Sequence, residues 1–160
     1  MARSLDAPGA SVALWWKRLS RLPQGRRLFS WMIGRTAPYT GTIGARVLEL
    51  GPGYSRWQMK DRRRVRNHLN SIHAVALVNL AEVTSGTAML MTLPAGTRGI
   101  VTSLSTTFVK KARGTLTAEC RCELPPFTGE THFDLNAEIR NAGGEVVATA
   151  TVTWLLSRTA

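Results

Sequence analysis

The sequence predicts an α+β domain in which antiparallel strands wrap around one long, buried α-helix. First, residues 72–91 form an almost continuous apolar run whose length suits a helix and exceeds that of an ordinary strand. Second, most segments on either side alternate apolar and polar residues with the two-residue period of half-buried strands. Third, the 160-residue chain is 44% hydrophobic and 19% charged, which is the composition of one globular domain with its own core.

This composition excludes wholesale disorder, collagen-like repetition and a small domain held together by disulfides. The two cysteines, Cys120 and Cys122, would point to one face of a strand at a spacing too wide for an unstrained disulfide. Two thiols without neighbouring histidines are too few ligands for zinc, so we expect no metal site. Because no segment resembles a secretory signal, we expect a cytoplasmic protein with two reduced, buried thiols.

The net charge of +11 is concentrated in the first part of the chain. Residues 1–66 contain 14 Lys/Arg and 3 Asp/Glu, a charge of +11, whereas residues 67–160 contain 7 of each. Such an imbalance favours a polyanionic partner, namely a nucleic acid, an anionic membrane surface or a phosphorylated small molecule. A basic face that only solvates the protein is the alternative interpretation.

The N-terminal segment has helical rather than strand spacing. Its apolar residues recur at helical intervals, as Val12, Trp15, Leu19 and Leu22. Pro23 and Gly25 interrupt this pattern, and residues 28–33 indicate a second short helix. We therefore predict an N-terminal helical extension over residues 1–39, before a strand-rich domain over residues 40–160. Tryptophan and arginine on such a helix also suit a membrane surface, but packing of the helix across the domain is the favoured interpretation.

Strands are predicted on both sides of the apolar run. Two of them, over residues 45–50 and 54–59, flank the tight turn Gly51-Pro52-Gly53. Four more follow the run, over residues 98–109, 116–123, 133–140 and 146–156. Each of these four has one apolar face, which on the first strand would consist of Ile100, Leu104 and Phe108. The long helix is the apolar element that these faces can wrap, so we expect protein to surround it.

The apolar run also has the length of a bilayer span. It contains Asn79, Glu82 and Thr84, however, and these polar side chains argue against a membrane-spanning helix. We therefore predict no membrane span.

The order of these elements is the plan of the hotdog fold, and two motifs support the likeness. Asn67-x5-His73-Ala74-Val75 with Leu80-Ala81-Glu82 resembles the Asn…His-Gly-Gly…Leu-Ala-Asp pattern of acyl-CoA thioesterases of the phenylacetate-pathway type. The segment from Phe108 to Glu119 resembles that family's aromatic-x-x-Pro-x-x-x-Gly-x-Leu segment, with Lys111 in place of proline. The resemblance covers residues 40–157, which would form the hotdog domain, and is strongest to an uncharacterised, thioesterase-like branch.

By this resemblance the protein hydrolyses an acyl or aryl thioester of coenzyme A without any cofactor, since coenzyme A is part of the substrate. Glu82 would activate water or attack the thioester directly. Burial in an apolar helix would raise the pKa of its carboxyl, which suits a base acting near neutral pH. A structural carboxylate held by Asn79 or Ser85 is the alternative.

The other site residues that the resemblance implies surround the start of the helix. Amide N–H groups around His73 and Ala74 would form the oxyanion hole, while His73 itself is either structural or a proton-transfer group. Asn67 would orient water or the carbonyl, or cap the helix. Ala74 and Val75 replace two glycines of the family pattern, so the Val75 side chain would narrow the channel for the substrate.

Six basic residues are predicted to contact the phosphates of coenzyme A, because Arg and Lys at a site mouth suit such groups. They are Arg62, Arg63 and Arg64 before the helix, and Lys110, Lys111 and Arg113 after Phe108. Solvated surface charge is the alternative for all six. A non-catalytic acyl-CoA-binding module and a basic nucleic-acid-binding protein are the alternative functions. Because the chain has no recognisable nucleic-acid motif, we expect no nucleic-acid partner.

Helix geometry predicts assembly. His73 and Glu82 are nine residues apart, which places them on opposite sides of a helix and about 13.5 Å apart along its axis. One helix cannot bring both to one thioester, and hotdog proteins build composite sites between protomers. We therefore predict a homodimer or a dimer of dimers, with Glu82 from one chain and Asn67 and the Ala74 N–H from the other.

Overall fold

The structure is a computed structural model that describes residues 8–158. Its helices are α1 (Pro8–Leu19), α2 (Gly25–Thr36), α3 (Pro38–Gly41) and α4 (Ala74–Leu90), with a short 3₁₀ helix, η1, at Arg63–Val65. The strands are β1 (Arg46–Gly51), β2 (Tyr54–Met59), β3 (Thr97–Phe108), β4 (Leu116–Arg121), β5 (Thr131–Arg140) and β6 (Val146–Arg158). The predicted long helix and the six predicted strands are confirmed to within a few residues at their ends, while α3 was not expected.

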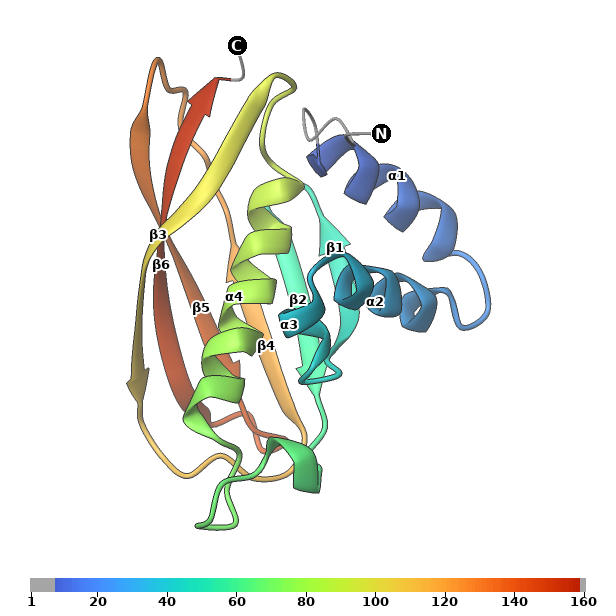
Figure 1. Cartoon of the computed structure of the whole chain (residues 1–160), viewed down its shortest axis with the longest axis vertical. Helices are drawn as coiled ribbons and strands as arrows, with labels where there is room; N and C mark the ends of the chain where they lie inside the picture. Colours follow the sequence, from blue (N-terminus) through green and yellow to red (C-terminus); the bar gives the residue numbers. More distant parts are fainter. Residues whose placement is uncertain (1–7, 159–160) are drawn as a thin grey trace.

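The six strands form one antiparallel sheet in the order β1-β2-β4-β5-β6-β3. This sheet curves around α4, as Figure 1 shows, so the predicted arrangement of a sheet wrapped around a central helix is confirmed. Strands β1 and β3 are the two edges of the sheet. The helices α1, α2 and α3 lie beside α4 on the β1 side (Figure 1).

Helix α4 is buried on almost every side because its sequence offers apolar or small residues at nearly every position. Leu80, Ala81 and Met89 are among the most completely buried residues of the chain. Thr87, one of its buried polar residues, is paired inside the core: its hydroxyl lies 2.7 Å from the Ser55 hydroxyl and accepts the Trp57 indole N–H at 2.9 Å. Buried polar groups that bond one another cost little, so α4 can run through the core.

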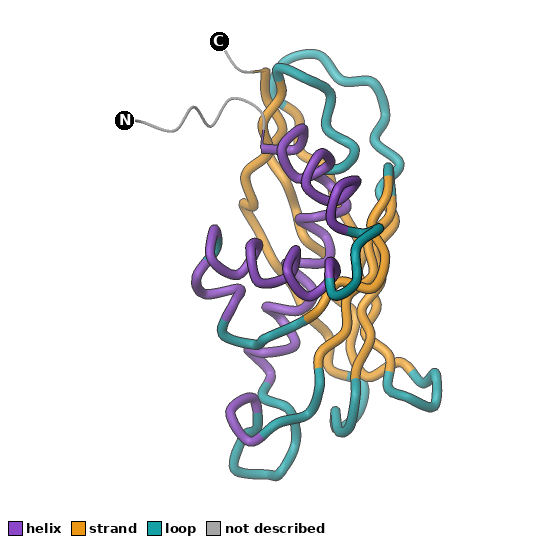
Figure 2. Tube along the Cα trace, turned by 90° about the vertical axis from the view of Figure 1, so that its right-hand side faces the viewer, coloured by secondary structure: helices purple, strands orange, loops and turns teal. Residues whose placement is uncertain are grey.

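The N-terminal helices pack on the domain through Trp16, Leu19 and Phe29, whereas Trp15 and Leu22 of the apolar side predicted from the sequence are exposed. Trp16 of α1 contacts Phe29 of α2 edge-on with ring centroids 5.2 Å apart, and Phe29 is buried in the common core. The Val47 amide of edge strand β1 donates to the Ser30 hydroxyl of α2 at 2.9 Å, so α2 covers part of this edge (Figure 2). The division of the chain at residue 39 stays a prediction, and residues 1–7 and 159–160 lie outside the described range.

The apolar face predicted for the first strand after the long helix, which is β3, is wrong. Ile100 does not share the core face of β3 with Leu104, because the register of the β3–β6 pair shifts between Val101 and Ser103. This bulge inserts one residue, so Ile100 points outward with 57% of its surface exposed. The apolar faces predicted for the next three strands are confirmed, including the buried, free thiols of Cys120 and Cys122.

Among residues 8–158, no helix is long and apolar enough to cross a membrane.

Candidate functional site

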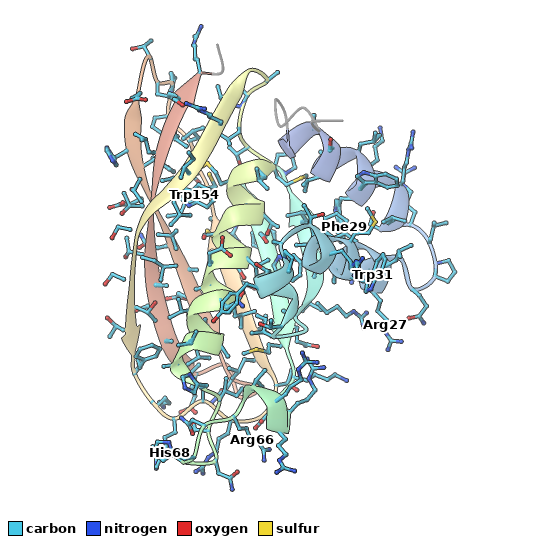
Figure 3. All side chains as sticks on the ribbon, in the orientation of Figure 1. Arg27, Phe29, Trp31, Arg66, His68 and Trp154 are labelled. Carbon is cyan, nitrogen blue, oxygen red and sulfur yellow. The ribbon has the colours of Figure 1, made fainter. Side chains whose placement is uncertain are left out.

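Glu82 lies on the one incompletely covered stripe of α4, which begins at Ala74 and Val75 and continues through Val78, Glu82, Gly86 and Leu90. A Cβ atom built on Gly86 would lie 3.6 Å from Cη2 of Trp154 and 3.8 Å from Oε1 of Glu82, so both side chains lie beside this glycine. Figure 3 shows Trp154 on the β6 side of α4. The site is therefore framed by a helix and by an indole on the sheet.

The carboxylate of Glu82 has no hydrogen-bond or ion-pair partner among residues 8–158. Ser85 donates to the main-chain oxygen of Glu82 at 3.1 Å, and Asn79 donates to the main-chain oxygen of Tyr39 at 3.0 Å. The structural alternative requires Asn79 or Ser85 to hold the carboxylate, and neither residue does so. Burial without a compensating partner raises the pKa of Glu82, which makes its carboxylate a stronger proton acceptor than that of an ordinary glutamate.

Helix α4 begins at Ala74 with His73 as its N-cap residue. The Val75 N–H donates to Nδ1 of His73 at 3.1 Å, which requires an Nδ1 atom without a proton. The Ala76 and Leu77 amides bond to the main-chain oxygen of His73. Within the described part of the chain, the Ala74 N–H has no acceptor. It is the first amide of a seventeen-residue helix and carries the positive end of its dipole.

Asn67 shapes the turn that leads into α4. Its side-chain oxygen accepts the amides of Leu69 at 3.0 Å and Ser71 at 3.2 Å. The helix cap is thus His73 and not Asn67. The side-chain oxygen of Asn67 is therefore occupied by these two amides.

The predicted basic residues fall into separate groups. The loop after β3 is tied to the start of α4, because Ala112 accepts the Ile72 amide at 2.8 Å and Arg113 donates to the Asn70 carbonyl at 3.2 Å. This contact places Lys111 and Arg113 beside the helix start, with exposed side chains. Lys110 instead forms an ion pair with Glu145 at 2.8 Å.

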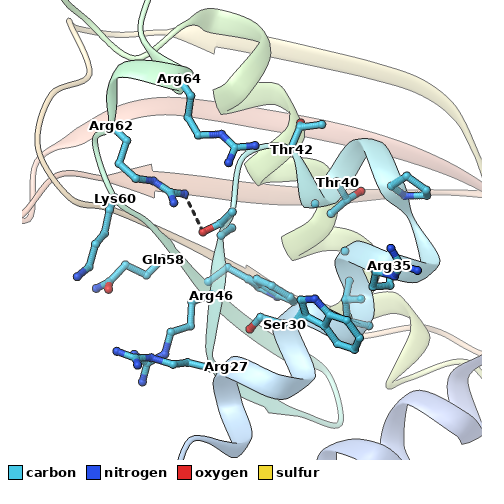
Figure 4. A pocket seen from close by; sticks show the side chains of 18 residues that line it. Arg27, Ser30, Arg35, Thr40, Thr42, Arg46, Gln58, Lys60, Arg62 and Arg64 are labelled. Carbon is cyan, nitrogen blue, oxygen red and sulfur yellow. Dashed lines mark hydrogen bonds between the residues drawn. The ribbon is translucent and has the colours of Figure 1, made fainter.

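Arg62 and Arg64 line a different feature, a cavity of about 720 Å³ between α2, α3 and the β1–β2 edge of the sheet (Figure 4). Arg62 donates to the main-chain oxygens of Ile43 at 2.8 Å and Gly44 at 3.1 Å. Arg63 does not line this cavity. The cavity is not predicted by the sequence, although the stretch without acidic residues between Asp6 and Glu49 is a signal of its charge.

Ala74 and Glu82 are eight residues apart on one straight helix, which corresponds to about 12 Å along its axis. One chain does not bring the free amide and the carboxylate to the same thioester. Among residues 8–158, no three His, Cys, Asp or Glu side chains cluster as metal ligands would.

A family model described as a domain of unknown function (DUF4442) matches residues 25–156. The crystal structure of the structural-genomics protein APC5556 has a TM-score of 0.81 and 28% identity, covering 92% of this chain and 98% of that one. A Pseudomonas aeruginosa protein of unknown function, described as a probable thioesterase, has a TM-score of 0.72 and 24% identity, covering 86% and 97%. A thioesterase family protein from Silicibacter pomeroyi has a TM-score of 0.68 and 18% identity, covering 85% and 99%. No curated protein sequence shows significant similarity to the chain.

Proposed function

This chain belongs to the DUF4442 family and has the hotdog fold of proteins named thioesterases, and on that premise we propose that it hydrolyses acyl-CoA thioesters. The observation that carries the proposal is the carboxylate of Glu82, partly buried and unpaired among the described residues, at the acidic position of the thioesterase motif. An unpaired, desolvated carboxylate costs stability, so its presence in this helix favours a functional role.

In the proposed reaction, Glu82 of one protomer takes a proton from water as the water oxygen attacks the thioester carbonyl carbon. The carbonyl oxygen gains negative charge and accepts the Ala74 N–H of a second protomer. When the tetrahedral intermediate collapses, the carbon–sulfur bond breaks, and the proton on Glu82 passes to the leaving thiolate of coenzyme A. The products are a carboxylic acid and free coenzyme A.

The phosphates of coenzyme A would lie near Lys111 and Arg113, because the loop that carries them is bonded to the residues just before α4. Both are cations at the same end of α4 as the free amide. Arg62 and Arg64 line the separate cavity beside α2, so we assign them no contact with coenzyme A, and the contacts that the sequence predicted for Arg62, Arg63 and Arg64 are untested.

A panel of acyl-CoA substrates with a thiol-trapping reagent tests the proposal. We expect turnover of at least one thioester, and a loss of at least about 100-fold in kcat for Glu82→Gln, the usual scale for removal of a general base. Glu123→Gln is the matched control, since Glu123 is an exposed carboxylate on the loop after β4.

A non-catalytic acyl-CoA-binding module is the second candidate, and Val75 is the observation that favours it. Its side chain is 47% exposed on the same stripe as Glu82, at a position where the thioesterase pattern has glycine. Binding of acyl-CoA without turnover of any thioester would support this module and contradict the hydrolase.

A further inference from the structure

The two N-terminal helices present a surface that neither the core nor the proposed thioesterase site uses. Between Asp6 and Glu49 the sequence has no acidic residue and seven Arg and Lys. The same segment exposes six large hydrophobic side chains, which are Leu14, Trp15, Leu22, Leu28, Trp31 and Tyr39. We propose that this surface, called here the α1–α2 outer face, docks onto an anionic lipid bilayer.

Helical spacing explains why basic and apolar groups share the outer face. On α2, Arg27, Trp31 and Arg35 are four residues apart and so point to one side of the helix. Figure 3 shows Arg27 and Trp31 farther out from the sheet than the buried Phe29. The Trp31 indole is 62% exposed, and the Arg35 guanidinium lies 5.9 Å from its ring centroid. On α1, Leu14, Trp15 and Arg18 are exposed while Leu19 enters the core. Figure 2 views both helices from this side of the molecule.

The cavity beside α2 extends this face with an unusual concentration of charge. Six of its lining side chains are basic and none is acidic, the six being Arg27, Arg35, Arg46, Lys60, Arg62 and Arg64. None of the six belongs to an ion pair within residues 8–158. Figure 4 shows the charged ends of Arg27, Arg46 and Lys60 on the same side of the cavity. Cations gathered without counter-ions repel one another, so phosphate groups would stabilise this arrangement.

The combination of groups identifies the partner. Tryptophan and tyrosine favour the membrane–water interface, and leucine favours the acyl region below it. Nucleic acid would explain the arginines but not exposed Leu14, Leu22 and Leu28. A second copy of this basic face would add like-charge repulsion. An anionic bilayer accepts both kinds of side chain, with its phosphates at the cavity and its interface at the indoles.

Docking through this face leaves the proposed catalytic region free. The cavity lies at the β1 edge of the sheet, whereas Glu82 lies beside Gly86 together with Trp154 of β6, which pairs with the opposite edge strand β3. A second protomer can therefore approach α4 while the outer face contacts lipid.

Co-sedimentation of the full chain with vesicles tests the proposal. We expect binding to phosphatidylcholine vesicles that contain phosphatidylglycerol, little binding to pure phosphatidylcholine, and release at high salt. Each cation near an anionic surface contributes about a fivefold factor to binding, so Arg27→Gln with Arg35→Gln should weaken it roughly 20- to 30-fold. The control is Arg121→Gln with Arg140→Gln, which removes the same charge from exposed positions of β4 and β5.

A second pair of variants separates a bilayer from other polyanions. Trp15→Ala with Trp31→Ala should weaken vesicle binding several-fold, whereas Ile100→Ala, at an exposed apolar residue of β3, should not. The proposal is overturned if the protein does not bind the anionic vesicles at low salt. It is also overturned if the Arg27/Arg35 variant and the Arg121/Arg140 control lose vesicle binding equally. It is also overturned if the tryptophan variants bind vesicles normally, if single-stranded DNA binds more tightly than vesicles, or if the outer face is buried between copies in solution. Circular dichroism of each variant confirms that it is folded.

Discussion

Nδ1 of His73 accepts the Val75 N–H at 3.1 Å, and this bond leaves Ala74 with the free amide at the start of α4. The N-cap residue therefore selects which amide can meet an oxyanion. Because the same bond holds the imidazole through Nδ1, His73 is a positioning residue in the proposed site. We expect it to fix the helix start and not to transfer a proton through Nδ1.

Ala74→Pro should remove the free N–H without disturbing the helix. Proline suits the first position of a helix, and His73 has φ −65° and ψ 140°, which is compatible with a following proline. We expect a loss of about 10²- to 10³-fold in kcat with little change in Tm, as measured by thioesterase assay and thermal unfolding. Ala74→Ser keeps the N–H and should retain most activity. If the proline variant is equally active, this amide is not the oxyanion hole.

Glu82→Gln should stabilise the protein at neutral pH. The pKa of Glu82 is raised by burial, so the protonated carboxyl contributes stability that is complete below the unfolded-state pKa and is lost as pH rises through the folded-state pKa. Glutamine avoids that loss. The free energy of unfolding of the variant should exceed that of the parent at pH 7–8, and the two should converge in the acidic carboxyl range. A constant difference across pH would contradict a desolvated carboxylate.

Val75→Gly tests whether the valine side chain narrows the substrate channel. Glycine matches the thioesterase pattern, so kcat/KM for bulky acyl-CoA substrates should rise more than for acetyl-CoA. The helix should lose up to about 1 kcal/mol of stability, as expected for glycine near a helix start. Val109→Gly, at an exposed residue after β3, is the control for apolar surface lost elsewhere. A uniform change for all acyl chains would show that Val75 does not line the channel.

Two charge-reversal pairs separate the basic groups. Lys111→Glu with Arg113→Glu should raise KM for acyl-CoA about tenfold or more. The KM for a short thioester without the nucleotide should not change. Arg62→Glu with Arg64→Glu, in the cavity beside α2, should have little effect on KM for either substrate. The reverse result would assign coenzyme A to that cavity.

Mixed dimers test the composite site. A heterodimer of Glu82→Gln with Ala74→Pro contains one site with both changes and one intact site, so about half of the parent activity should return. Each homodimer carries one change in every site and should stay inactive. Verified heterodimers without recovered activity would show that each chain builds its own site.

How far sequence alone predicts this protein depends on the range of the interactions involved. The strand faces of β4, β5 and β6 and the burial of α4 follow from side-chain period, which is set by neighbours along the chain. Glu82 stands out for the same reason, as the one charged residue of that helix.

Tertiary structure decided the rest. The bulge in β3 that turns Ile100 outward depends on pairing with β6, which no local pattern encodes. The cavity of six basic side chains joins α2, β1, β2 and the loop before η1, so its charge density appears only when residues 27–64 come together. Composition determined that the N-terminal region is basic, whereas packing decided which of its charges converge, because convergence depends on distances in space and not along the chain.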